Sequence, residues 1–152
     1  MLLSELLSPE RVKVPLAGRT KDELLRELVA LAAPAGEPAT ADAILAAVRD
    51  REQELSTGIG AGVAIPHAKT PFVDQLVMAA GIAPEPVDFD ALDGQPVQLF
   101  FLLVGPESAA GAHVKALARI SRLLRRDSLR SLLRAARTPD AFLQVVRDSE
   151  TG

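Results

Sequence analysis

The segment from Val97 to Val104 constrains the fold more than any other part of the chain. Residues 99–103 are consecutive and apolar, and the segment has the length of a strand. A continuous apolar run of this length is typical of a strand whose two faces are both buried. It therefore predicts a buried strand in a sheet that is covered on both sides.

The flanking segments alternate between helical and extended patterns. A capping box, Thr20–Glu23, begins a helix that should end near residues 34–36, and the pair Thr138-Pro139 begins the last helix. Together the patterns predict an α/β fold in a single domain, residues 1–152, with a mixed β-sheet flanked by helices on both faces. The other expected elements are strands over 11–16, 63–65 and 76–83, helices over 40–55, 110–126 and 128–136, a loop over 56–62, and turns at 84–86 and 93–96.

Composition removes several classes of function. The chain has no cysteine, which excludes disulfides and thiolate chemistry, and its two histidines show no metal-ligand spacing. Five phenylalanines without Trp or Tyr are few for base stacking on single-stranded nucleic acid. The first residues do not form a signal peptide, and no apolar run is long enough to span a bilayer. We expect a cytoplasmic protein with no membrane insertion, no metal and no cofactor.

Charge is distributed unevenly along the chain. Residues 1–110 carry 8 basic and 16 acidic side chains, whereas residues 111–152 carry 9 and 4. The basic third is interpreted first as a solvated helix face, and contact with phosphate or an acidic partner is the alternative. Nucleic-acid binding by the basic helices over 114–137 is a minor hypothesis, because their apolar positions predict packing on a sheet. The predicted inward face of the first of these helices is Val114, Leu117, Ala118, Ser121 and Leu124.

The segment Ser56–His67 carries the strongest chemical signal. Three glycines stand at every second position from 58 to 62, which suits a backbone that approaches something closely or adopts positive φ. Pro66 removes a donor from the strand, so His67 is expected at the mouth of the strand over 63–65. A neutral imidazole can accept a phosphoryl group and release it again. The alternative for His67 is a purely structural role.

Two further residues could assist such chemistry. Arg51 stands near the end of the second helix and could offset phosphate charge, although it could also pair with a neighbouring carboxylate on the surface. His113 lies near the start of the first C-terminal helix, where a capping role is the alternative. The glycine pattern matches neither a Walker motif nor a dinucleotide fingerprint, which disfavours nucleotide binding.

At this point the sequence resembles a known family. Arg51-Glu52, Ser56–His67, Val87–Val97 and His113 follow one another as in the enzyme IIA domains of the bacterial phosphoenolpyruvate:sugar phosphotransferase system (PTS). The similarity is to the fructose/mannitol type, which includes the nitrogen-regulatory IIA proteins, and it covers nearly the whole chain.

The resemblance implies a phosphotransferase role. It implies that His67 accepts a phosphoryl group from phosphorylated HPr, or an HPr-like carrier, and passes it to an enzyme IIB domain. It further implies that His113 and Arg51 line the same pocket, and we expect Thr57 and Gly58 to bind phosphate as well.

A regulatory role stays open beside transport. In that alternative the same phosphohistidine changes the affinity for a regulated target protein, since phosphorylation adds about −1.5 to −2 of charge. Ala68 stands where many relatives have glycine, and this difference slightly favours the sugar-transport branch of the family over the nitrogen-regulatory branch.

Overall fold

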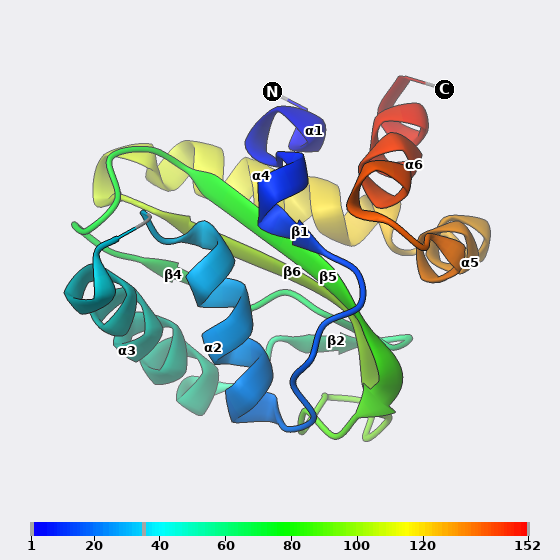
Figure 1. Cartoon of the computed structure of the whole chain (residues 1–152), viewed down its shortest axis with the longest axis horizontal. Helices are drawn as coiled ribbons and strands as arrows, with labels where there is room; N and C mark the ends of the chain where they lie inside the picture. Colours follow the sequence, from blue (N-terminus) through cyan, green and yellow to red (C-terminus); the bar gives the residue numbers. More distant parts are fainter. Residues whose placement is uncertain (1, 35, 152) are drawn as a thin grey trace.

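The computed structural model describes residues 2–34 and 36–151, which form a mixed sheet between two layers of helices (Figure 1). Within these residues the strand order is β1-β5-β6-β3-β2, and β4 also pairs with β6. Strands β5 and β6 are antiparallel, as are β2 and β3, whereas β1–β5, β3–β6 and β4–β6 are parallel. The mixed sheet expected from the sequence is confirmed. The strands are β1 (Val12–Lys13), β2 (Gly58–Gly60), β3 (Val63–Ala64), β4 (His67–Lys69), β5 (Val77–Val87) and β6 (Val97–Gly105).

Helices cover both faces of this sheet. In Figure 1, α2 and α3 lie in front of the sheet and α4 lies behind it. The helices are α1 (Leu3–Leu6), α2 (Lys21–Ala32), α3 (Pro38–Glu54), α4 (Ala110–Leu123), α5 (Asp127–Ala135) and α6 (Pro139–Thr151), with 3-10 turns at Pro9–Arg11 and Glu107–Ala109.

Strand β6 divides the core in two, as its sequence predicts. Phe100 and Leu102 pack in a cluster with α2 and α3, whereas Leu99, Phe101 and Leu103 pack in a second cluster with α1, α4, α5 and α6. All five side chains are at most 2% exposed. Because successive side chains of a strand point to opposite faces, β6 contributes to the hydrophobic core under each of the two helix layers.

The predicted helix starts are confirmed in their capping atoms. The Thr20 hydroxyl oxygen accepts from the Glu23 N–H at 3.2 Å, and that of Thr138 accepts from the Ala141 N–H at 3.0 Å. Helix α3 begins at Pro38, two residues earlier than expected, because proline is well suited to the first helical turn.

Three expectations about local structure were wrong. The turn expected at residues 84–86 is part of β5, whose register with β6 shifts between Ile82 and Val87. The expected loop over 56–62 contains β2, which forms a hairpin with β3. The strand expected over 11–16 is only two residues long, because a 3-10 turn precedes it.

The buried face predicted for α4 was wrong at its start by one position, whereas Leu124 is buried and Leu117 packs against the core as expected. Val114 is 62% exposed, and the buried residues of the helix are His113, Ala116 and Ile120. The sequence pattern treated the histidine as polar and placed its apolar neighbour inside. The fold instead buries the imidazole of His113.

Candidate functional site: a pocket with two histidines

His67 begins strand β4 instead of ending the strand before it, as the sequence had suggested. Pro66 separates β3 from β4, and its carbonyl accepts from the Leu103 N–H at 3.0 Å. His67 then pairs in parallel register with Leu103 of β6. The imidazole is therefore held against the central strand of the sheet.

One ring nitrogen of His67 is already occupied. Nδ1 lies 2.8 Å from the carbonyl oxygen of Ile65. Because a carbonyl only accepts, this contact assigns the proton to Nδ1 and leaves the lone pair on Nε2.

The fold brings His113 to His67 across 46 residues of sequence. The ring centroids lie 5.7 Å apart at an interplanar angle of 64°. His113 is 2% exposed, and its Nδ1 is buried without a hydrogen-bond partner among the described residues. Burial, with smaller contributions from His67 and Lys69, lowers the pKa of His113 from 6.5 to about 4. His113 is therefore neutral near pH 7.

The pKa of His67 is lowered as well. Burial is the largest cause, and the charges of Arg51 and Lys69 act in the same direction. The hydrogen bond to Ile65 and the charge of Glu52 oppose them but do not prevail. A neutral imidazole with a free Nε2 is the nucleophilic form of histidine.

Both rings line one pocket of about 490 Å³. Arg51 reaches this pocket from the last turn of α3, where one of its N–H groups donates to the Leu55 carbonyl at 2.9 Å. The predicted trio of His67, His113 and Arg51 is therefore brought together. The pocket is lined by Ala47, Asp50, Arg51, Glu54, His67, Ala68, Lys69, His113, Val114 and Leu117.

Thr57 and Gly58 do not line this pocket. The N–H and hydroxyl of Thr57 donate to the Glu52 carboxylate, and the Gly58 N–H donates to the Ser56 hydroxyl oxygen at 3.1 Å. A Cβ at Gly58 would lie 2.7 Å from the Cβ of Ala91. Close packing explains this glycine, and direct phosphate contact by either residue finds no support in the geometry.

Sequence reasoning missed Lys69 and the buried Glu52. Lys69 stands two residues after His67 on β4 and lowers the pKa of both histidines. The period of two along a strand could have placed it on the same side. Glu52 was noted only as part of the family motif with Arg51, and its charged neighbours on α3 gave no sign that its carboxylate would be buried.

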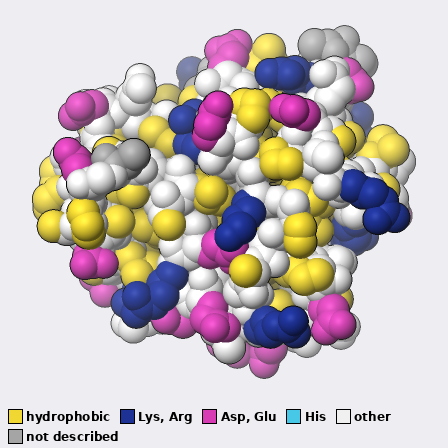
Figure 2. Space-filling view, viewed as in Figure 1, with side chains coloured by type: hydrophobic (Ala, Val, Ile, Leu, Met, Phe, Trp, Pro, Cys, Tyr) yellow, Lys and Arg dark blue, Asp and Glu magenta, His cyan; other side chains and the backbone are white. Residues whose placement is uncertain are grey.

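Helix α3 contributes directly to the site, because Ala47, Asp50, Arg51 and Glu54 line the pocket of the two histidines. On the face shown in Figure 2, basic and acidic side chains alternate and no histidine is visible. Within residues 2–34 and 36–151, no cluster of three or more His, Asp or Glu side chains could hold a metal ion. None of the helices in the described parts of the chain combines the length and apolarity of a bilayer-spanning segment.

Fold and site together define an α/β protein with a pocket that holds a pair of histidines, one partly exposed and one buried. The chain belongs to the EIIA 2 family of the phosphoenolpyruvate-dependent sugar phosphotransferase system, whose family model matches residues 5–149.

Relatives of two kinds match the chain. A nitrogen regulatory protein of Bradyrhizobium diazoefficiens is 40% identical over 147 residues, covering 96% of this chain and 95% of that protein. The fructose-specific EIIABC component of Bacillus subtilis is 36% identical over 150 residues, and the match covers 99% of this chain but 24% of that protein. The chain thus spans about a quarter of the longer relative's length.

The solved structures agree on the fold. The nitrogen regulatory protein IIA-Ntr of Neisseria meningitidis superposes with a TM-score of 0.87 at 29% identity, covering 95% of this chain and 98% of that one. The mannitol IIA protein of Escherichia coli gives a TM-score of 0.75 at 19% identity, with 92% and 98% covered.

Proposed function

We propose that this protein is a phosphocarrier that accepts a phosphoryl group on Nε2 of His67 from a phosphorylated HPr-type carrier. The observation that carries the proposal is the hydrogen bond from His67 Nδ1 to Ile65 at 2.8 Å, which leaves Nε2 as the free nucleophile in a pocket shared with His113 and Arg51.

The reaction follows from this protonation state. A bond forms between Nε2 of His67 and phosphorus while the bond from phosphorus to the donor's nitrogen breaks, and the donor leaves with its electron pair. No proton has to move during the attack, because the proton stays on Nδ1 and is donated throughout to the Ile65 carbonyl oxygen. The positive character that the ring gains is stabilised by the same hydrogen bond.

The remaining side chains act on the phosphoryl oxygens. Arg51 and Lys69 supply positive charge, and the neutral His113 has one N–H to donate. Because both cations already lower the pKa of His67, their field is present before the phosphoryl group arrives. Such preorganised charge stabilises phosphoryl transfer without reorganisation at the moment of reaction.

An enzyme IIB domain is the proposed acceptor. This chain superposes with a TM-score of 0.74 on a chain in the solved complex of mannitol IIA with phosphorylated mannitol IIB from Escherichia coli. The fructose-specific relative favours this relay role in sugar transport.

A regulatory switch is the second candidate. The match to a nitrogen regulatory protein extends over nearly the full length of both chains, which favours a phosphorylation-dependent contact with a regulated target. A IIB domain that removes the phosphoryl group would favour relay, whereas capture of a non-transport protein by only one phosphorylation state would favour switching.

Phosphorylation with phosphoenolpyruvate, enzyme I and HPr tests the central claim. Wild type should gain one acid-labile phosphate by intact mass, and His67→Ala should gain none while keeping its circular dichroism spectrum. A phosphorylated His67→Ala variant would contradict the assignment.

A further inference from the structure

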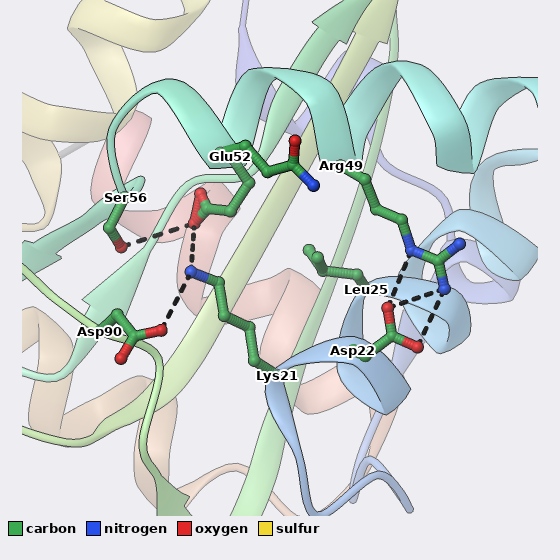
Figure 3. A pocket seen from close by; sticks show the side chains of 8 residues that line it. Lys21, Asp22, Leu25, Arg49, Glu52, Ser56 and Asp90 are labelled. Carbon is green, nitrogen blue, oxygen red and sulfur yellow. Dashed lines mark hydrogen bonds and ion pairs between the residues drawn. The ribbon is translucent and has the colours of Figure 1, made fainter.

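Glu52 is a buried carboxylate with no role in the chemistry proposed above. It is 6% exposed and lies in the last turns of α3. It lines a second pocket, of about 580 Å³, between α2 and α3. Figure 3 shows this pocket, with the ammonium group of Lys21 pointing between the carboxylates of Glu52 and Asp90.

Its charge is compensated and its oxygens are occupied. The N–H of Thr57 lies 2.9 Å from each carboxylate oxygen, and the Thr57 hydroxyl lies 3.0 Å from each. The ammonium of Lys21 is 3.5 Å from Oε1 and sits 4.7 Å from the ring centroid of Phe89. Glu52 therefore fixes both donors of a single residue, Thr57.

The hydrogen bonds continue from Thr57 to the proposed nucleophile. The Thr57 carbonyl accepts from the Ile65 N–H at 2.9 Å, and the Ile65 carbonyl in turn accepts from His67 Nδ1 at 2.8 Å. Three successive hydrogen bonds thus connect the Glu52 carboxylate to the imidazole. The strands that carry them are short, since β2 has three residues and β3 has two.

We propose that Glu52 is a positioning residue for phosphoryl transfer. The Glu52 carboxylate accepts from the Thr57 N–H, and the Thr57 carbonyl accepts from the Ile65 N–H. The Ile65 carbonyl then sets the orientation of the His67 ring and keeps the proton on Nδ1. The proposal rests on the proposed function of His67.

The hairpin of β2 and β3 is weak, and this is the physical reason why Thr57 needs a contact from outside the hairpin. The pairing of β2 with β3 shifts register between Gly58 and Gly60, and Gly60, Ala61 and Gly62 all have positive φ. Strand β6 holds the neighbours of Ile65, since Ala64 pairs with Phe100 and the Pro66 carbonyl accepts from the Leu103 N–H. On its other side Ile65 depends on Thr57, which so short and irregular a ladder holds only weakly. The buried carboxylate on α3, a long and regular element, supplies that hold.

Three variants separate positioning from general stability. Glu52→Ala removes the acceptor, whereas Glu52→Gln keeps an oxygen for the Thr57 N–H and an amide for the Thr57 hydroxyl. Glu150→Ala is the matched control, because the Glu150 side chain is also buried and also accepts from backbone N–H groups, but from those of Leu3 and Ser4 where α1 meets α6.

The first readout is the rate of phosphoryl acceptance at saturating phosphorylated HPr, measured together with KM at a temperature where every variant is folded. We expect Glu52→Ala to lower the saturated rate about 10²-fold with an unchanged KM, because misplacing a reacting group by about 1 Å has this effect. Glu52→Gln should restore most of the rate. A Glu52→Ala rate within twofold of wild type would overturn the proposal, as would a Glu52→Gln rate as low as that of Glu52→Ala or an equal loss in Glu150→Ala.

If Glu52→Ala does not fold, Thr57→Val carries the same test. It keeps the branched side chain and removes one hydrogen bond to Glu52, so the rate should fall about fivefold, the equivalent of a single hydrogen bond. An unchanged rate would overturn the proposal.

The second readout does not need phosphoryl transfer. The chain has two histidines, so their ring-proton signals can be titrated separately by NMR. Because the charge of Glu52 raises the pKa of His67, Glu52→Gln should lower that pKa and Glu150→Ala should leave it unchanged. Failure of wild type to accept phosphate would reject the proposed function alone, whereas an identical His67 titration in wild type and Glu52→Gln would reject the link from Glu52 to the ring.

Discussion

Two buried carboxylates, Glu52 and Glu150, hold different parts of the backbone in this molecule. Glu52 binds backbone only five residues further along the chain, at Thr57. Glu150, whose side chain is fully buried, accepts from the N–H groups of Leu3 and Ser4 at 2.7 and 3.0 Å, 147 and 146 residues away. The local contact shapes a loop beside the histidines, whereas the distant contact ties the two ends of the chain together.

The partners of the two carboxylates differ as well. Arg119 of α4 donates to Glu150 at 2.7 Å, so three elements, α1, α4 and α6, meet at one carboxylate. Glu52 is paired only loosely with Lys21 and faces a pocket. The comparison teaches that equal burial does not imply equal purpose: one carboxylate stabilises the fold and the other positions a reactive side chain.

The largest effect that separates the two regions is expected from Glu150→Ala. It leaves two backbone N–H groups without acceptors and Arg119 without its partner, so the free energy of unfolding should fall by about 4 kcal/mol. Urea unfolding followed by circular dichroism would measure this. Phosphoryl acceptance below the unfolding transition should be unchanged, and a lowered rate there would break the comparison.

The next effect is expected at the site, from Arg51→Gln. The variant removes positive charge from the pocket, and the saturated rate of phosphoryl acceptance should fall about 10²- to 10³-fold, as when one preorganised donor is lost. The free energy of unfolding should change by less than about 0.5 kcal/mol, because Arg51 is partly exposed. If Arg51→Gln also lowers the free energy of unfolding strongly, Arg51 stabilises the fold as well as the site, and the prediction is wrong.

The two regions should also respond to acid in different pH windows. The pKa of His113 is lowered to about 4 in the folded state, so the unfolded chain binds the extra proton below pH 6.5 and stability is lost as pH falls from 6.5 to 4. The full loss corresponds to about 3 kcal/mol, and His113→Gln should remove it. Urea unfolding at pH 7.5 and at pH 5 measures this slope, and equal slopes in wild type and His113→Gln would contradict the prediction.

Glu150 should act only at lower pH. Burial opposes its ionisation, but hydrogen bonds from the Ser4 and Leu3 N–H groups and from Arg119 lower its pKa below the ordinary 4.5. Its contribution to stability is present above pH 4.5 and is lost as pH falls through the folded pKa. The stabilisation by Glu150 is therefore lost at lower pH than most of the stabilisation by His113.

The smallest effect is expected from Gly58→Ala in the hairpin. The added methyl would lie 2.9 Å from the Cα of Ala91, so the free energy of unfolding should fall by about 1–3 kcal/mol through overpacking. Gly111→Ala is the control, since its added methyl meets nothing within 4 Å and its φ is not in the left-handed region. If Gly58→Ala is no less stable than Gly111→Ala, packing does not explain the glycine at position 58.

Much of the fold was readable in the sequence because strong local patterns had no competitor. Residues 99–103 are apolar on both faces, so only a strand covered on both sides could bury them. Thr20 and Thr138 predict the starts of two helices, and their capping hydrogen bonds confirm both. Residues 84–86 show the limit of such reasoning, since two prolines suggested a turn where β5 continues through a register shift.

The site was partly readable for the same reason. His67 follows a distinctive motif, and the resemblance of that motif to a family connected it with His113 and Arg51. The roles expected for Thr57 and Gly58 followed from the usual behaviour of glycine-rich loops, but the loop turned out to be a hairpin whose donors are used inside the protein.

By itself, the sequence determined most of the helices, the buried central strand and the histidine best suited to chemistry, because these depend on neighbours along the chain. Only the tertiary structure decided that His113 is buried against His67, that Nδ1 of His67 is occupied, and that Glu52 lies at the start of a hydrogen-bonded path to the ring. Those facts depend on which atoms meet across the sheet and around α3. Such contacts are set by packing between segments, and periodicity within one segment carries no record of them.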